Sequence, residues 1–130
     1  MREAVNAAKA SKGEGPYSQA IAANGFVFVS GQGPLDPETD KVVEGTIEEQ
    51  AVLTLNNVKA ILEAAGCKMN DVVKVGVFLA DMKDFDRFNA VYRTFFDRPL
   101  PARTCVEAGL GDILVEIDAI AAIPENGANV

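Results

Sequence analysis

The sequence contains no histidine and no tryptophan, and only two of its 130 residues are cysteines. Histidine is the side chain used most often for acid–base chemistry near pH 7, and it is the commonest metal ligand. Any catalysis is therefore expected to use Arg, Asp, Glu, Tyr, Ser, Cys or backbone groups. Cys67 and Cys105 stand far apart and outside any metal-ligand spacing, so we expect neither a disulfide framework nor a metal site.

Long apolar runs are also missing, since no stretch approaches the roughly 18 residues that a membrane-spanning helix needs. The first residues show no charged-then-apolar leader, and no Asn-x-Ser/Thr acceptor for glycosylation occurs. We therefore expect a cytoplasmic protein without a membrane partner. The net charge of −7 argues against a nucleic acid partner, because phosphate groups would be repelled.

What is present is typical of one globular domain over residues 1–130, with 48% hydrophobic and 24% charged residues. Asn24-Gly25 separates two apolar stretches and favours a type I′ turn, which predicts a hairpin of strands 17–23 and 26–30. An edge strand is expected within residues 1–10.

Two helices are predicted from caps and helical spacing. The first begins at Thr46, where Glu49 completes a capping box, and ends at Gly66. The second begins near Asp84 and ends at the proline-rich segment 98–101. Each carries one apolar stripe and hence one buried face, formed in the first by Val52, Leu55, Val58, Ile61, Leu62 and Ala65, and in the second by Phe85, Phe88, Val91, Tyr92, Phe95 and Phe96.

Three further strands are predicted at 72–80, 103–108 and 114–122. In the strand at 72–80, period-two alternation predicts that one face carries Val73, Val75, Val77 and Leu79. The other face is then expected to carry Val72, Phe78 and Ala80. The order β-β-β-α-β-α-β-β predicts an α+β fold, in which two helices pack on one face of a mixed six-stranded sheet. Self-association is expected to cover the other face.

The strand 103–108 carries an unusual set of side chains. Arg103, Cys105 and Glu107 occupy alternate positions, so one face of this strand is expected to present a guanidinium, a thiol and a carboxylate. From this strand alone, an arginine paired with a nearby acid as a surface ion pair is the more common arrangement.

Several sequence blocks occur in an order that extends from about Gly15 to Ile123. The blocks are GPYSQA at 15–20, VSGQ at 29–32, NNV at 56–58, VFL at 77–79, FNAVY at 88–92, PARTCVE at 101–107 and VEIDAIA at 115–121. Together they resemble the Rid (YjgF) family of reactive-intermediate imine/enamine deaminases. The resemblance implies a homotrimer with a chorismate-mutase-like fold and sites in clefts between subunits.

The same resemblance implies cofactor-free hydrolysis of 2-imino and 2-enamino acids, such as 2-aminoacrylate and 2-iminobutyrate, to 2-keto acids and ammonia. This activity protects other enzymes from reactive enamines. Arg103 is then expected to bind the substrate carboxylate through two parallel hydrogen bonds. Glu116 matches the family carboxylate that orients, and can deprotonate, the hydrolytic water, with Asp118 and Glu107 as competing candidates.

The remaining family positions line the pocket. Tyr17, Ser30 and Asn89 are expected to contribute side chains, and Gly31 and Cys105 backbone groups. Tyr17 is otherwise explained as a packing residue of the hairpin, Ser30 as a locally satisfied hydroxyl and Asn89 as a buried amide.

Two features of the last strands qualify this assignment. The loop at 108–113 is shorter than the usual family form and has Gly111 where a proline normally follows the leucine, and a one-residue slip here would invert the face of Glu116. Cys105 is expected to be a packed or redox-sensitive thiol rather than a nucleophile, since only Arg103 could lower its pKa.

Two alternative functions use the same residues. A trimeric module that binds small carboxylates without turnover needs the same arginine. A translation inhibitor that cleaves RNA is the third possibility, which the acidic balance and the lack of histidine oppose.

Overall fold

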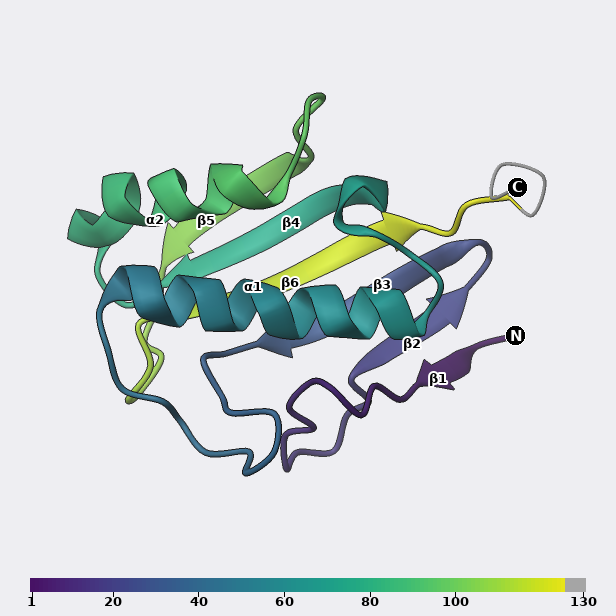
Figure 1. Cartoon of the computed structure of the whole chain (residues 1–130), viewed down its shortest axis with the longest axis horizontal. Coiled ribbons are helices and arrows are strands. Elements are labelled where there is room, and N and C mark those ends of the chain that lie inside the picture. The colour runs from purple at the N-terminus through teal and green to yellow at the C-terminus, as the bar shows by residue number, and fades with distance from the viewer. Residues whose placement is uncertain (126–130) are drawn as a thin grey trace.

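The computed structural model describes residues 1–125, so the last five residues of the domain expected over 1–130 lie outside the described part. The elements follow the predicted order (Figure 1). They are β1 (Glu3–Val5), β2 (Ala20–Ala23), β3 (Phe26–Gln32), α1 (Ile47–Ala64), β4 (Val72–Leu79), α2 (Phe85–Tyr92), β5 (Ala102–Glu107) and β6 (Val115–Ala122). Single turns of 3₁₀-helix lie at Met69–Asp71, Met82–Asp84 and Arg93–Phe95.

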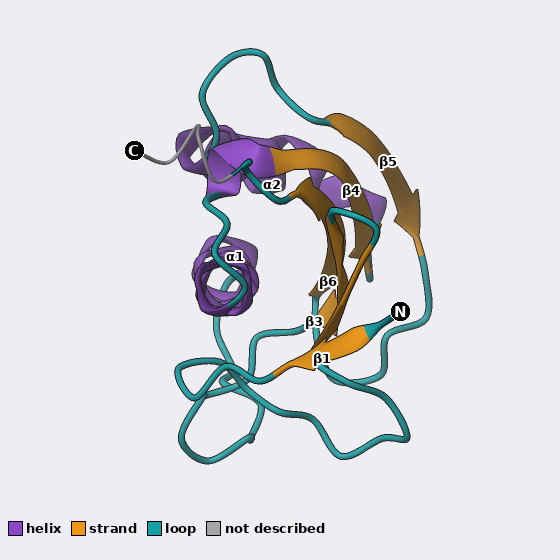
Figure 2. Ribbon diagram, turned by 90° about the vertical axis from the view of Figure 1, so that its right-hand side faces the viewer, coloured by secondary structure: helices purple, strands orange, loops and turns teal. Residues whose placement is uncertain are grey.

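The strands form one six-stranded sheet in the order β1-β2-β3-β6-β4-β5. Neighbouring strands are antiparallel except β4 and β5, which are parallel and are joined by a crossover that contains α2. Both long helices lie on one face of the sheet, and no helix of residues 1–125 covers the other (Figure 2). The predicted α+β class is confirmed.

The hairpin turn forms as predicted, because Asn24 and Gly25 both have positive φ, at 52° and 83°. The strand limits differ from the prediction. β2 begins at Ala20 rather than at residue 17, and β3 continues to Gln32. Just before β2, the backbone carbonyl of Gln19 still accepts a 3.0 Å bond from the N–H of Ser30, while the buried Gln19 side chain binds the backbone of Ala7, Ala10 and Ser11.

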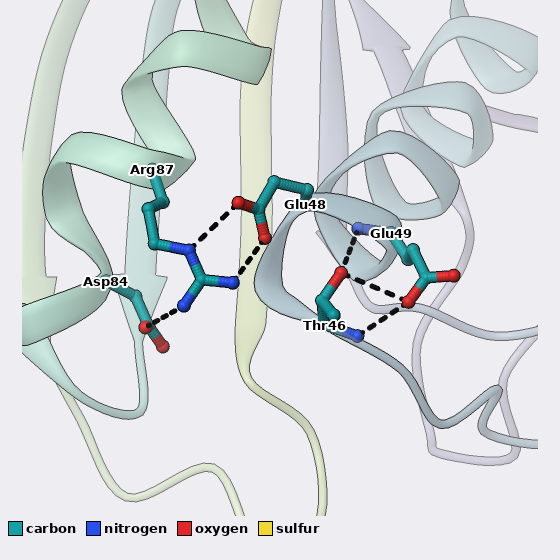
Figure 3. A network of polar contacts seen from close by, with 5 residues as sticks. All are labelled: Thr46, Glu48, Glu49, Asp84 and Arg87. Atoms are coloured by element: carbon teal, nitrogen blue, oxygen red, sulfur yellow. Dashed lines mark hydrogen bonds and ion pairs between the residues drawn. The ribbon is translucent and has the colours of Figure 1, made fainter.

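The ends of α1 also follow the prediction. The Thr46 and Glu49 side chains complete a capping box (Figure 3), and Gly66 has a φ of 84° just after the helix. The predicted stripe is wrong at Val52, which is 42% exposed. The buried stripe passes through Ala51 and Leu55, and Val52 is rotated about 100° from Ala51 around the helix axis.

In β4 the predicted alternation holds from Val75 onward, where Val75, Val77 and Leu79 are buried. It is wrong at the start of the strand, because Val72 is buried and Val73 is 45% exposed. The pairing with β6 shifts between Val72 and Lys74, and this bulge inverts the faces of the residues before it.

The two helices are joined at their exposed ends as well as through the core. Arg87 of α2 binds both carboxylate oxygens of Glu48 in α1, at 2.9 and 2.6 Å (Figure 3). These bonds lower the pKa of Glu48 to about 2. Asp84 precedes α2 as predicted, but its side chain makes no capping bond and lies 3.7 Å from Arg87 instead.

The open face of the sheet is the face opposite the helices. It carries Glu116 and Asp118 on β6, together with exposed aromatic and aliphatic side chains. Phe26, Phe28 and Val106 are among them, each at least 40% exposed. An apolar face of this kind is typical of an interaction surface.

No helix within residues 1–125 is long and apolar enough to cross a membrane.

Candidate functional site

Arg103 lies on the edge strand β5 and points toward α2. Its Nη1 donates a hydrogen bond of 2.8 Å to Oδ1 of Asn89. The guanidinium carbon lies over three aromatic rings of α2, 4.7 Å from the centroid of Tyr92, 5.7 Å from Phe85 and 6.0 Å from Phe88. Such contacts contribute roughly 0.5–2 kcal/mol each and keep the charge in place without neutralising it.

No acidic side chain of residues 1–125 forms an ion pair with Arg103, so the surface ion pair considered as its alternative role does not form in this part of the chain. The arginine instead lines a cavity of about 560 Å³. The other lining residues come from α2 and from the segment that leads into β5, and they are Asn89, Tyr92, Arg93, Phe96, Arg98, Leu100 and Pro101. The guanidinium is therefore presented to a hollow of the size that ligand pockets have.

Cys105 lies two residues further along β5 on the same side, partly buried against the core. Burial raises the pKa of its thiol, and the nearby Arg103 charge opposes this only in part. A protonated thiol is a poor nucleophile, which agrees with the expectation of a packed cysteine. Because β5 is the last strand of the sheet order, one of its edges has no strand partner within residues 1–125.

Glu116 lies on β6 and faces the open side of the sheet, since the alternate residues Val115 and Ile117 are buried toward the helices. Burial, and then the charge of Asp118, raise the pKa of Glu116. The carboxylate packs on the bare backbone of Gly31, where an added Cβ would lie 2.7 Å from Oε2. Gly31 thus leaves room for this carboxylate.

Tyr17 and Ser30 lie near Gly31. The Ser30 hydroxyl donates a 2.6 Å hydrogen bond to the carbonyl of Ser18. Tyr17 is 54% exposed, and its ring lies against Gly13 and Gly15, where any Cβ would overlap it. Tyr17 and Gly31 also line one small hollow of about 20 Å³.

The structure therefore divides the expected site residues into two groups. Arg103, Asn89 and Cys105 form one on the helix side, while Tyr17, Ser30, Gly31 and Glu116 form the other around the open face. Arg103 and Glu116 lie on opposite faces of the sheet, with β4 between their strands. One chain alone does not bring these two side chains into one cavity.

The two competing carboxylates differ in their surroundings. Glu107 accepts a 2.8 Å hydrogen bond from the backbone N–H of Met82, which ties it to the turn after β4. Asp118 lies beside Glu116 on the open face, and its Oδ1 occupies the space that a side chain at Gly76 would need. Within residues 1–125, no three His, Cys, Asp or Glu side chains gather as a metal site.

The sequence did not point to several residues that surround Arg103. The aromatic cage, formed by the rings of Phe85, Phe88 and Tyr92 around Arg103, was predicted only as part of the apolar face of a helix. Arg93 and Arg98 were not singled out. For Arg93, the sequence did offer a signal. Its i, i+4 spacing from Asn89 places both residues on one side of a helix.

Comparison with known proteins gives close relatives along nearly the whole chain. The family model described as Endoribonuclease L-PSP matches residues 7–123. A RutC family protein of Pyrococcus horikoshii is 50% identical over 123 residues, covering 93% of this chain and 98% of its own. The 2-iminobutanoate/2-iminopropanoate deaminase of Salmonella typhimurium is 43% identical over 126 residues, covering 93% and 98%. A Thermotoga maritima protein, crystallised as a candidate endoribonuclease, is 46% identical with a TM-score of 0.90, covering 96% and 100%.

Proposed function

Because the chain belongs to the endoribonuclease L-PSP family, also called the YjgF/Rid family, we propose that it is a hydrolytic deaminase of 2-imino acids. It converts 2-iminobutyrate, 2-iminopropionate and their enamine tautomers, such as 2-aminoacrylate, to 2-keto acids and ammonia. The observation that carries this proposal is the half-buried Arg103, held by Asn89 over a cavity without a carboxylate partner in residues 1–125. Several relatives 40–43% identical are named as deaminases of this type.

The active unit is proposed to be a cytoplasmic homotrimer. Since Arg103 and Glu116 lie on opposite faces of one sheet, a complete site takes Arg103, Asn89 and Cys105 from one copy. The neighbouring copy then supplies Tyr17, Ser30, Gly31 and Glu116. Packing of the open faces against one another would bury their exposed aromatic side chains, which favours association.

The proposed reaction uses residues of the chain and no cofactor. Arg103 holds the substrate carboxylate through two charge-assisted hydrogen bonds, which fixes C2 of the imine near Glu116. The Glu116 carboxylate takes a proton from water as the water oxygen attacks C2. Glu116 returns that proton to the imine nitrogen, which gives a neutral carbinolamine. Glu116 then moves the hydroxyl proton of the carbinolamine to the same nitrogen, so that the C–N bond breaks, ammonia leaves and the carbonyl of the 2-keto acid forms. A raised pKa places Glu116 closer to the working pH, where a base can both take and return a proton.

The test compares wild type with Arg103→Ala on 2-iminobutyrate generated in the assay by an upstream dehydratase. We expect wild type to release ammonia faster than buffer alone, and Arg103→Ala to lose roughly a hundredfold or more in kcat/KM with an unchanged trimer. Arg2→Ala, which removes an exposed arginine outside the cavity, is the matched control.

Two results would replace this proposal. Carboxylate binding by wild type without faster ammonia release identifies a binding module. Cleavage of RNA without imine hydrolysis identifies a ribonuclease. Unchanged activity in Arg103→Ala would exclude the arginine as the carboxylate ligand.

A further inference from the structure

Three arginines line the cavity at α2 and β5, although the chain as a whole carries a net charge of −7. They are Arg93, Arg98 and Arg103, and the lining contains no Asp or Glu. Neither Arg93 nor Arg98 forms an ion pair with any acid of residues 1–125. The cavity is therefore a local cationic site on an otherwise acidic protein.

Asn89 fixes two of these three guanidinium groups. Its side-chain Oδ1 accepts the bond from Nη1 of Arg103, and its backbone carbonyl accepts a 3.2 Å bond from Nε of Arg93. Because Arg93 is bound only through Nε, its two terminal nitrogens have no acceptor in the described part of the chain. Arg93 and Arg103 are thus placed by one residue of one helix, as paired binding groups should be.

Arg98 adds the third charge from the segment between α2 and β5. Its neighbour Asp97 forms no ion pair with Arg98. The Asp97 carboxylate instead accepts a 2.7 Å hydrogen bond from the Asn70 side chain. The backbone N–H of Asp97 also binds the Asn70 side chain, at 2.9 Å. Asp97 is absent from the lining of the three-arginine cavity.

One guanidinium is sufficient to bind one carboxylate in a bidentate manner. The deamination proposed above uses Arg103 alone, so Arg93 and Arg98 remain for a second anionic group on the same substrate. The protein's overall negative charge repels a dianion, and grouped cations offset that repulsion inside the cavity.

We propose that this site accepts 2-imino dicarboxylic acids of four or five carbons, with the distal carboxylate bound by Arg93 and Arg98. This inference rests on the proposed deaminase function and extends its substrate class. The reaction is the same hydrolysis, in which one water and the imine give one 2-keto dicarboxylic acid and one ammonia. The class of reaction that supplies such a substrate is the two-electron oxidation of an amino dicarboxylic acid.

The experiment measures kcat/KM for 2-iminoglutarate and for 2-iminobutyrate, each generated in the assay by an amino-acid oxidase. We expect Arg93→Gln and Arg98→Gln each to lower the ratio of the two values, dicarboxylic over monocarboxylic, by roughly tenfold. Added salt should lower the wild-type ratio too, because it screens the distal charge. Arg2→Gln, which also removes one exposed positive charge but lies outside the cavity, should leave the ratio unchanged.

A binding measurement separates the failure of this inference from failure of the deaminase proposal. Calorimetry with the stable products 2-oxoglutarate and 2-oxobutyrate should show tighter binding of the dicarboxylate, and Arg93→Gln should remove that preference. If wild type hydrolyses 2-iminobutyrate while both arginine variants keep the wild-type ratio, the substrate class is wrong and the deaminase stands.

Two other results overturn the inference directly. Equal binding of both keto acids by wild type excludes a distal carboxylate site. A change in trimer stability in Arg93→Gln or Arg98→Gln, with an unchanged ratio, shows that the arginines bind acids of a neighbouring copy instead.

Discussion

Arg103 is half-buried and uses few of its hydrogen-bond donors. A guanidinium has five N–H donors. Within residues 1–125, Arg103 uses one of them, in the bond from Nη1 to Asn89. Removing a cation from water costs free energy unless something replaces the lost hydration. The rings of Tyr92, Phe85 and Phe88 replace part of it, and an anionic ligand would replace the rest.

The neighbouring carboxylates Glu116 and Asp118 allow the role of Glu116 to be tested by pH. The charge of Asp118 is the second cause, after burial, of the raised pKa of Glu116. If ionised Glu116 takes the proton of water, kcat/KM should rise with pH as Glu116 loses its proton. This rise should lie above pH 4.5, because the pKa of Glu116 is raised from its ordinary value of 4.5. Asp118→Asn removes a negative charge, lowers the pKa of Glu116 and should move this acidic limb to lower pH.

The measurement is the pH profile of kcat/KM on 2-iminobutyrate, after subtraction of the hydrolysis in buffer. Asp86→Asn removes an equal charge from an exposed position on α2, and its profile should match wild type. An acidic limb that stays in place in Asp118→Asn would mean that another group is the base.

At this scale the sequence identified candidate residues, and the structure adds their contacts. Arg103, Asn89 and Glu116 were identified from blocks that resemble a family, and the structure gives each a defined surrounding. The aromatic cage could not be predicted in the same way. Helical spacing shows that Phe85 and Tyr92 share an apolar face, but not that an arginine from a later strand lies over it.

At the scale of the elements, Gln50 holds the loop that precedes β6. This buried side chain of α1 accepts a 2.8 Å bond from the N–H of Leu114 and donates a 3.0 Å bond to the carbonyl of Val43. Leu114 directly precedes β6, where Val115 pairs with Leu79 and Glu116 with Phe78. Gln50 therefore ties α1 to the segment that leads into β6, the strand that carries Glu116.

Gln50→Leu should leave the Leu114 N–H and the Val43 carbonyl without partners. An unsatisfied buried group costs roughly 1–3 kcal/mol, and both bonds are only partly buried, so we expect the free energy of unfolding to fall by about 1–3 kcal/mol in total. Urea unfolding at one fixed protein concentration measures the loss, because an oligomer's stability depends on concentration. Lys59→Leu, an exposed change on the same helix, should be close to neutral, and equal stability of Gln50→Leu and wild type would contradict the assigned role.

Elements defined by local chemistry were predicted well, and those defined by distant partners were not. The Thr46 capping box and the Asn24-Gly25 turn depend on residues within a few positions of one another. The bulge that buries Val72 and exposes Val73 depends on how β4 pairs with β6, more than 40 residues later. Likewise, the N–H of Leu114, just before β6, is bound by a residue of α1, which no strand pattern reveals.

At the scale of the whole molecule, the two groups of expected site residues link the open face of the sheet to the assembly of a complete site. Arg103 belongs to the helix side and Glu116 to the open side, and one rigid sheet separates them. The sequence predicted that the uncovered face would associate, since apolar side chains such as Phe78 alternate with those of the core. Under the proposed function, one association of copies would both bury this face and complete the site.

A subunit-mixing experiment tests this arrangement with two inactive variants. Arg103→Ala lacks the carboxylate ligand, and Glu116→Gln lacks the base, so each homotrimer should have three defective sites. In a mixed trimer, a site that takes Arg103 from a Glu116→Gln chain and Glu116 from an Arg103→Ala chain is intact.

The two variants are unfolded together in equal amounts, refolded and assayed on 2-iminobutyrate. Random assembly makes each of the two required choices with a chance of one half, so about one quarter of the sites should be intact and about one quarter of the wild-type kcat should return. The same variants refolded separately and then assayed as a mixture should stay inactive, because their chains have not exchanged. A site built within one chain predicts no recovery under either condition, since every chain then carries one defect. The recovered fraction therefore distinguishes a site shared between copies from a site within one copy, without relying on the size of either single-variant loss.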